Sequence, residues 1–228
     1  MHSYFLVAGR AGDPIELRVE RLRDGRSFSQ RRVVALQDGR EVMRSLTSFH
    51  ASEDGLEWDA PVTGTAPPPT TAHRYTDYCD VIEAVLPEDE RPWSGRGRPM
   101  DVRYVDPPDL SDRASVTEPQ VMWMRVIGPL LRDRAVHDAG IAYLADLGMN
   151  PVILLPHGYS WRDERITEAS LDHTMWFHRP ARADDWLSYQ QRVEVTRGGR
   201  GLARGLFHDA DGRLIATCMQ EGLMRWQP

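Results

Sequence analysis

The sequence predicts an α+β protein built mainly from antiparallel strands, because it contains two strand-rich blocks and one helical pattern. In residues 26–51 and again in residues 200–226, two runs of strand-forming residues are joined by a turn that contains Asp-Gly. Asp-Gly between two such runs is a strong signal for a β-hairpin. Residues 133–151 instead repeat apolar side chains at helical spacing. One helix and several antiparallel strands are therefore expected to form the C-terminal unit.

The two strand-rich blocks are predicted to be copies of one unit. Residues 22–49 and 195–222 align with a single-residue gap, and each contains a Gly-Arg turn followed by an Asp-Gly-Arg turn. Such turns are common, but the strand-forming runs on both sides of them also match in length. This agreement favours an internal duplication.

The middle of the chain separates the two units. Residues 60–72 are rich in Pro and Thr and are expected to be a linker, and residues 77–86 could form a short helix. The second unit is expected to open with a strand in residues 119–128. The helix that follows is expected to end at Asn150-Pro151. Its predicted apolar face consists of Val136, Ala139, Gly140, Tyr143, Leu144 and Leu147.

The composition is that of an ordinary globular chain. Its 228 residues are 41% hydrophobic and 27% charged, and the net charge of −6 does not favour binding to nucleic acid. No run approaches the roughly 18 apolar residues of a membrane span, and residues 1–14 lack the features of a secretory signal. Cys79 and Cys218 lack the spacing of a zinc site or a disulfide scaffold. A cytoplasmic protein without a membrane span is expected.

Two polar residues occupy positions that do not favour stability. Asp146 falls in the last turn of the predicted helix, where a carboxylate faces the negative end of the helix dipole. It either points into water or serves as a general base. Gln220 alternates with Leu214, Ala216, Cys218 and Met224 along a strand. Either this side is buried and the amide needs partners, or the other face is buried and Gln220 lies in water. Cys218 is expected to be a small core residue rather than a nucleophile.

The stretch "ASLDHTMWFH" (residues 169–178) contains Asp172, His173 and His178, which could suggest a catalytic triad or a metal site. Neighbouring residues of a strand point to opposite faces, so Asp172 and His173 cannot both orient one group. Two histidines without a third ligand at a recognised spacing are weak evidence for a metal. Structural roles are therefore predicted for all three residues.

Six blocks of sequence carry a resemblance to a known family. In chain order they are "HSYFL", "VERLRDGRSFSQRRVVALQDG", "TSFH", "LDHTMWFHRP", "RGLARGLFHDADGRLIAT" and "QEGLMR". Together they resemble the acyl-CoA thioesterase II family, whose members carry two hot-dog domains in one chain, each an antiparallel sheet wrapped around a helix. The likeness is weakest between Ala66 and Arg98. It implies a partial N-terminal hot dog in residues 1–60, a linker in residues 61–98 and a C-terminal hot dog in residues 99–228.

The same resemblance implies a function and a site. The family hydrolyses fatty acyl-CoA to free fatty acid and CoA with an activated water, so acyl-CoA is the expected partner. Carried over by motif, the general base is Asp146, and Ser170 and Gln220 orient the water, with no covalent acyl-enzyme. No cofactor and no metal are implied. A homodimer or a higher homo-oligomer is expected.

One departure from the family pattern concerns the first unit. The family carries a strand and a long helix upstream of "HSYFL", so Met1 is expected to be an internal methionine and the first sheet is expected to expose an apolar face. This departure keeps a non-catalytic acyl-CoA-binding protein open as an alternative. An enoyl-CoA hydratase of the same fold is disfavoured, because Ile153 stands where its histidine would be.

Overall fold

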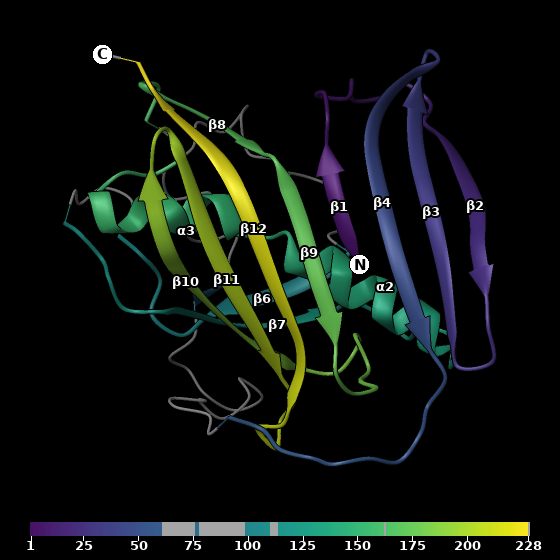
Figure 1. The fold of residues 1–228 in the computed structure, drawn as a ribbon. Coiled ribbons are helices and arrows are strands. Elements are labelled where there is room, and N and C mark those ends of the chain that lie inside the picture. Colours follow the sequence, from purple (N-terminus) through teal and green to yellow (C-terminus); the bar gives the residue numbers. More distant parts are fainter. Residues whose placement is uncertain (61–75, 78–98, 110–113, 162, 228) are drawn as a thin grey trace.

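The strands of the protein form one continuous antiparallel sheet. The computed structural model describes residues 1–60, 76–77, 99–109, 114–161 and 163–227. Its twelve described strands are β1 (His2–Phe5), β2 (Glu16–Asp24), β3 (Phe28–Gln37), β4 (Arg40–His50), β5 (Thr76–Asp77), β6 (Met100–Tyr104), β7 (Gln120–Val126), β8 (Ile166–Ser170), β9 (Asp172–Phe177), β10 (Leu187–Arg197), β11 (Arg200–His208) and β12 (Leu214–Trp226). Their order is β2-β3-β4-β1-β9-β12-β11-β10-β7-β6-β5, and β8 also pairs with β12 (Figure 1).

The predicted repeat corresponds to two antiparallel meanders, β2-β3-β4 and β10-β11-β12. Both predicted Asp-Gly hairpins are present. At the first, Asp38 and Gly39 have φ angles of 49° and 75°, the positive values that tight hairpin turns require. The two halves join where β1 pairs with β9, and Ser3 lies opposite His173 in that pairing.

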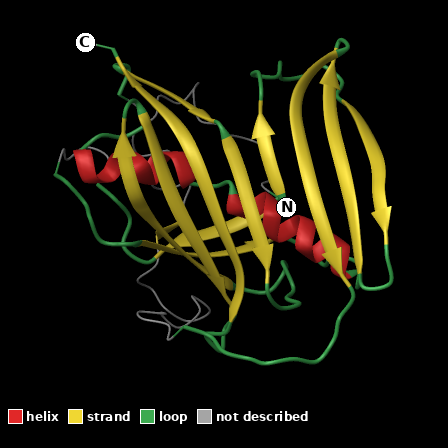
Figure 2. Cartoon of the chain, viewed as in Figure 1, coloured by secondary structure: helices red, strands yellow, loops and turns green. Residues whose placement is uncertain are grey.

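Two helices cover one face of the second half of the sheet. They are α2 (Arg134–Ala145) and α3 (Met149–Leu154), and a short 3₁₀ turn (Leu155–His157) follows them. Both lie behind the large strands in the view of Figure 2, where α3 packs on β10 to β12 and α2 packs on β7. The main hydrophobic core lies between the helices and the sheet and includes Ile141, Ile153 and Phe207, none of which is exposed. This sheet wrapped on a central helical segment is the hot-dog arrangement that the resemblance implies.

The buried stripe of α2 differs from the predicted one. The buried residues are His137, Ile141, Leu144 and Ala145, whereas Tyr143, which was assigned to the apolar face, is 52% exposed. Polarity misled the prediction, because His137 is buried with its Nδ1 accepting a hydrogen bond from the backbone N–H of Ala183 at 3.2 Å. A satisfied histidine can take a core position that a count of apolar residues leaves out.

The helical segment also does not end at Asn150-Pro151 as predicted. It breaks earlier, at Gly148 with a φ of 82°, and α3 then begins at Met149. Pro151 falls in the first turn of α3, where a backbone N–H has no partner within the helix, so its missing donor costs nothing. This break carries Asn150 into a helical turn that faces the sheet.

By length and composition alone, the segment from Arg134 to His157 is apolar enough to cross a membrane, with a mean hydropathy of 1.3. Of its most apolar 18 residues, 39% are buried. The core helix of a globular fold can be equally long and apolar. Ile141, Leu144 and Ile153 of this segment are completely buried in the protein core.

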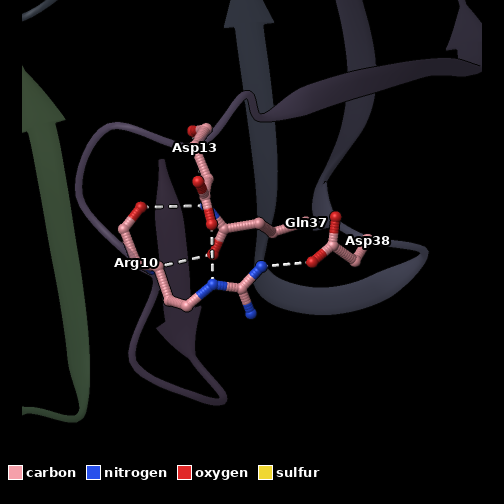
Figure 3. Close-up of polar contacts among 4 residues, drawn as sticks. All are labelled: Arg10, Asp13, Gln37 and Asp38. Atoms are coloured by element: carbon pink, nitrogen blue, oxygen red, sulfur yellow. Dashed lines mark hydrogen bonds and ion pairs between the residues drawn. The ribbon is translucent and has the colours of Figure 1, made fainter.

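The loop between β1 and β2 is tied to the turn between β3 and β4 (Figure 3). The side chain of Gln37, only 4% exposed, accepts a hydrogen bond from the Arg10 N–H at 2.7 Å and donates to the Arg10 carbonyl at 2.9 Å. The guanidinium of Arg10 pairs with Asp13 at 2.7 Å and also with Asp38. Exposed ion pairs contribute only about 0–1 kcal/mol. The buried amide of Gln37 is therefore the main fastening of this loop.

The first half of the sheet leaves part of an apolar face uncovered, as the sequence predicted, although Ala35 within this face is only 3% exposed. In the strand register Leu17, Ala35, Met43 and Phe5 form one row across four strands. Leu17 is 62% exposed, and Val19, two residues further along β2, is 65% exposed.

The predicted linker lies outside the described residues. So does the possible short helix of residues 77–86, apart from Asp77, which is part of β5.

Candidate active site

Three side chains from three separate elements meet beside the helix break. Gln220 of β12 donates from its Nε2 to Ser170 Oγ of β8 at 3.0 Å. Asn150 of α3 donates from its Nδ2 to the same oxygen at 3.2 Å. The Nε2 of Gln220 also donates to Asn150 Oδ1 at 3.3 Å, which closes the triangle. Two of the three residues, Ser170 and Gln220, belong to the site that the sequence predicted.

Gln220 lies on the buried face of its strand. It is 1% exposed and shares this face with Ala216 and Cys218, both fully buried. The alternative in which Gln220 lies in water is therefore wrong. Its Oε1 is 2.6 Å from Nδ1 of His173, and because a carbonyl oxygen only accepts, the histidine carries a hydrogen on Nδ1. The buried amide thus has partners on both its oxygen and its nitrogen.

A break between β8 and β9 places Ser170 next to Gln220. Strand β12 pairs with β9 from Ala216 to Met219, and with β8 from Gly222, which lies opposite Ser170, to its end. Between these stretches the carboxylate of Asp172 accepts a hydrogen bond from the backbone N–H of Glu221 at 2.8 Å. A side-chain acceptor therefore satisfies the donor that the interrupted ladder leaves free.

The three residues that could suggest a triad or a metal site, Asp172, His173 and His178, each have a separate partner. Asp172 binds backbone, His173 binds Gln220, and Nε2 of His178 lies 2.9 Å from Oγ1 of Thr217. Each contact holds a strand or a neighbouring side chain in place. Among the described residues, no group of three or more His, Cys, Asp or Glu side chains is arranged to hold a metal ion.

Asp146 is the C-cap residue of α2 and is exposed. Two side chains of β10 hold the backbone on either side of it. Tyr189 donates from its hydroxyl to the Ala145 carbonyl at 2.7 Å, and Gln191 donates from its Nε2 to the Leu147 carbonyl at 2.6 Å. The backbone that carries the Asp146 carboxylate is therefore fixed at both neighbouring residues.

The negative charge of Asp146 has a small effect on the pKa of the buried Cys218 thiol. Burial, together with the smaller effect of this negative charge, raises the pKa of the Cys218 thiol to about 12. Cys218 precedes Gln220 by two residues on the same buried face of β12. Among the described residues no hydrogen bond joins Asp146 to Ser170 or Gln220. The structure thus joins Ser170 and Gln220 directly, and in the described part of the chain it shows no hydrogen bond from Asp146 to either of them.

Sequence reasoning missed Asn150, Tyr189 and Gln191. Asn150 was interpreted as a helix stop because it precedes Pro151. Tyr189 and Gln191 stand two apart on β10, so they share a face, but no pattern in the sequence says that this face meets the end of α2. For Asn150 a signal existed, because it lies only four residues beyond the suspected base.

Comparison with known proteins identifies the class. A model of the acyl-CoA thioesterase C-terminal domain matches residues 77–224, and a model of the corresponding N-terminal domain matches residues 1–50. Acyl-coenzyme A thioesterase 8 of Rattus norvegicus is 33% identical, over 100% of this chain and 73% of the relative. Acyl-CoA thioesterase 2 of Haemophilus influenzae is 32% identical, over 99% of this chain and 78% of the relative.

Solved structures agree with this assignment. The acyl-CoA thioesterase II TesB2 from Mycobacterium marinum is 36% identical with a TM-score of 0.75, covering 99% of this chain and 79% of that one. A hot-dog protein from Alicyclobacillus acidocaldarius has a TM-score of 0.76 at 18% identity, covering 100% and 78%, and supports the fold alone. Fold and matches together define a hot-dog thioester hydrolase. The chain belongs to the acyl-CoA thioesterase II family.

Proposed function

We propose that the chain hydrolyses fatty acyl-CoA thioesters to free fatty acid and CoA, with Asp146 as general base and Ser170 and Gln220 orienting the attacking water. Membership of the family makes the chain an acyl-CoA thioesterase. The observation that carries the residue assignment is the 3.0 Å contact between the buried Gln220 amide and Ser170 Oγ. A fixed polar pair of this kind can hold a water molecule in one orientation.

The proposed reaction is a direct attack by water. Asp146 accepts a proton from the water as its oxygen bonds to the thioester carbonyl carbon, and the tetrahedral intermediate then releases the CoA sulfur. Water must reach the base, and the exposure of Asp146 allows this.

The surroundings of Ser170 and Cys218 argue against a covalent acyl-enzyme. The hydroxyl of Ser170 is bound by the amides of Asn150 and Gln220, and an amide cannot take up its proton as a histidine would. The Cys218 thiol, with a pKa of about 12, is protonated at neutral pH. Neither side chain is therefore prepared to act as a nucleophile.

The first test replaces Asp146 with its neutral near-isostere. We expect Asp146→Asn to lower kcat by about 10²- to 10⁴-fold, because the water loses its base. The measurement is release of free CoA from acyl-CoA substrates of several chain lengths. Asp185→Asn is the matched control, because the Asp185 side chain is 69% exposed and forms only a distant ion pair with Arg182.

The outcomes separate the proposed function from its alternative. Full turnover in the Asp146→Asn variant would show that another residue is the base. A wild-type chain that binds acyl-CoA but releases no CoA at any chain length would instead be a non-catalytic acyl-CoA-binding protein.

A further inference from the structure

We propose that Asn150 is a positioning residue of the hydrolytic site, and that its side-chain amide turns the hydroxyl hydrogen of Ser170 towards the attacking water. This inference rests on the proposed function. It starts from the triangle of hydrogen bonds in which Asn150 binds both Ser170 and Gln220 at 3.2 and 3.3 Å. Asn150 is also the single asparagine of the chain.

Contacts with β12 and β10 hold Asn150 next to Ser170 and Gln220. Strand β12 carries Gly222 beneath it, and a Cβ atom at that position would lie 2.5 Å from Asn150 Oδ1. The helix break just before Asn150 is itself held, because Gln191 binds the Leu147 carbonyl at 2.6 Å. The side chain of Asn150 is therefore pressed onto the sheet at the point where Ser170 and Gln220 meet.

The hydrogen bonds determine where the Ser170 hydrogen points. A serine hydroxyl has one hydrogen to donate and two lone pairs that accept. Both lone pairs of Ser170 Oγ receive amide hydrogens, one from Asn150 and one from Gln220. The hydroxyl hydrogen must therefore point away from both amides.

Gln220 therefore orients the water through Ser170 and not by direct donation. Both hydrogens of its Nε2 are used, towards Ser170 and Asn150, and its Oε1 accepts from His173 at 2.6 Å. Within this cluster Ser170 is thus the donor that remains for the reactants. A water that accepts from Ser170 and donates to Asp146 keeps one lone pair for attack on the thioester carbon.

The sharpest test is Asn150→Asp, which keeps the acceptor for Gln220, removes the donor to Ser170 and adds a negative charge that a control must match. An ionised carboxylate accepts only, so the Ser170 hydrogen should turn inward, away from the water. We expect kcat to fall by about 100-fold, the effect of losing one oriented donor in an active site. KM should change little, because aspartate has nearly the same size and shape as asparagine.

Two controls isolate the positioning role. Ala169→Asp places the same charge beside Ser170 on the exposed face of β8, and we expect it to keep nearly full turnover. In a Ser170→Ala background, Asn150→Asp should cause no further loss, since no hydroxyl remains to be turned. A merely structural role would still lower kcat in that background.

The results distinguish the two proposals. Suppose that the wild type releases CoA. If Asn150→Asp then keeps the wild-type kcat, or lowers kcat by the same factor whether or not Ser170 is replaced by Ala, the role of Asn150 is refuted and the proposed hydrolase function is unaffected. If wild type releases no CoA, the proposed function fails first. Should Asn150→Asp not fold, Asn150→Ala provides the same comparison, with a smaller expected loss of kcat and the same dependence on Ser170.

Discussion

At the scale of single residues, Cys218 shows how burial controls chemistry next to the site. The thiol is fully buried, lies 3.1 Å from the Tyr189 hydroxyl and packs against Gly205, where a Cβ atom would come within 2.6 Å of its sulfur. Burial is the largest cause that raises its pKa to about 12. Tyr189 meanwhile binds the Ala145 carbonyl, so the pair serves to hold the end of α2.

The raised pKa of Cys218 makes a prediction about alkylation. Because the thiol stays protonated far above its ordinary pKa of 9.0, iodoacetamide at pH 8 should leave Cys218 unmodified in the folded protein and modify it in denaturant. Peptide mapping distinguishes it from Cys79. Stability should fall as the pH rises from 9 towards 12, because the exposed thiol of the unfolded chain ionises before the buried one. Rapid modification of the folded protein at pH 8 would contradict this.

At the scale of elements, close contact between α3 and the sheet depends on two glycines. A Cβ atom at Gly201 of β11 would lie 2.1 Å from Cγ2 of Ile153, and one at Gly222 of β12 would lie 2.5 Å from Asn150 Oδ1. Real Cβ contacts are never this short. The two positions therefore set how near the helix can come to the strands that carry Gln220.

Replacing Gly222 tests this packing. Gly222→Ala should push α3 away from β12, lower the free energy of unfolding by about 1–3 kcal/mol through overpacking, and reduce turnover by disturbing Asn150. Chemical denaturation and CoA release measure the two effects. Gly55→Ala is the control, because a Cβ atom there meets nothing within 4 Å. Equal stability of the two variants would show that α3 adapts without cost.

At the scale of the whole molecule, the two halves of the sheet are covered unequally. The second half packs on α2 and α3, whereas Leu17 and Val19 in the first half are more than 60% exposed. Contiguous exposed apolar surface of this kind commonly marks an interface. We therefore propose that the chain forms a homodimer or a higher homo-oligomer through the face that carries Leu17 and Val19.

A charge on this face should weaken the association. We expect Val19→Lys to shift the protein towards the monomer in sedimentation measurements over a range of concentrations, with little change in thermal stability because Val19 is 65% exposed. Val195→Lys is the matched control, a valine of β10 in the second half that is 51% exposed. An unchanged distribution for Val19→Lys would place any interface elsewhere.

Features that depend on local patterns could be predicted from the amino-acid sequence. The two Asp-Gly hairpins, the meanders on either side of them, the strand of β7 and the core position of Cys218 were all predicted, because turn residues and alternating side chains act over a few positions. Motif resemblance supplied Ser170 and Gln220, which the fold then places 3.0 Å apart.

Contacts between residues far apart in the chain could be seen only once the chain was folded. The stripe of α2 was mispredicted because the partner that makes a buried His137 acceptable is Ala183, 46 residues away. Asn150 gained its role because a break at Gly148 turned it onto β12, beside a glycine 72 residues further along. Local spacing cannot predict such contacts, since they arise when helix and sheet pack together and each buried polar atom finds a partner.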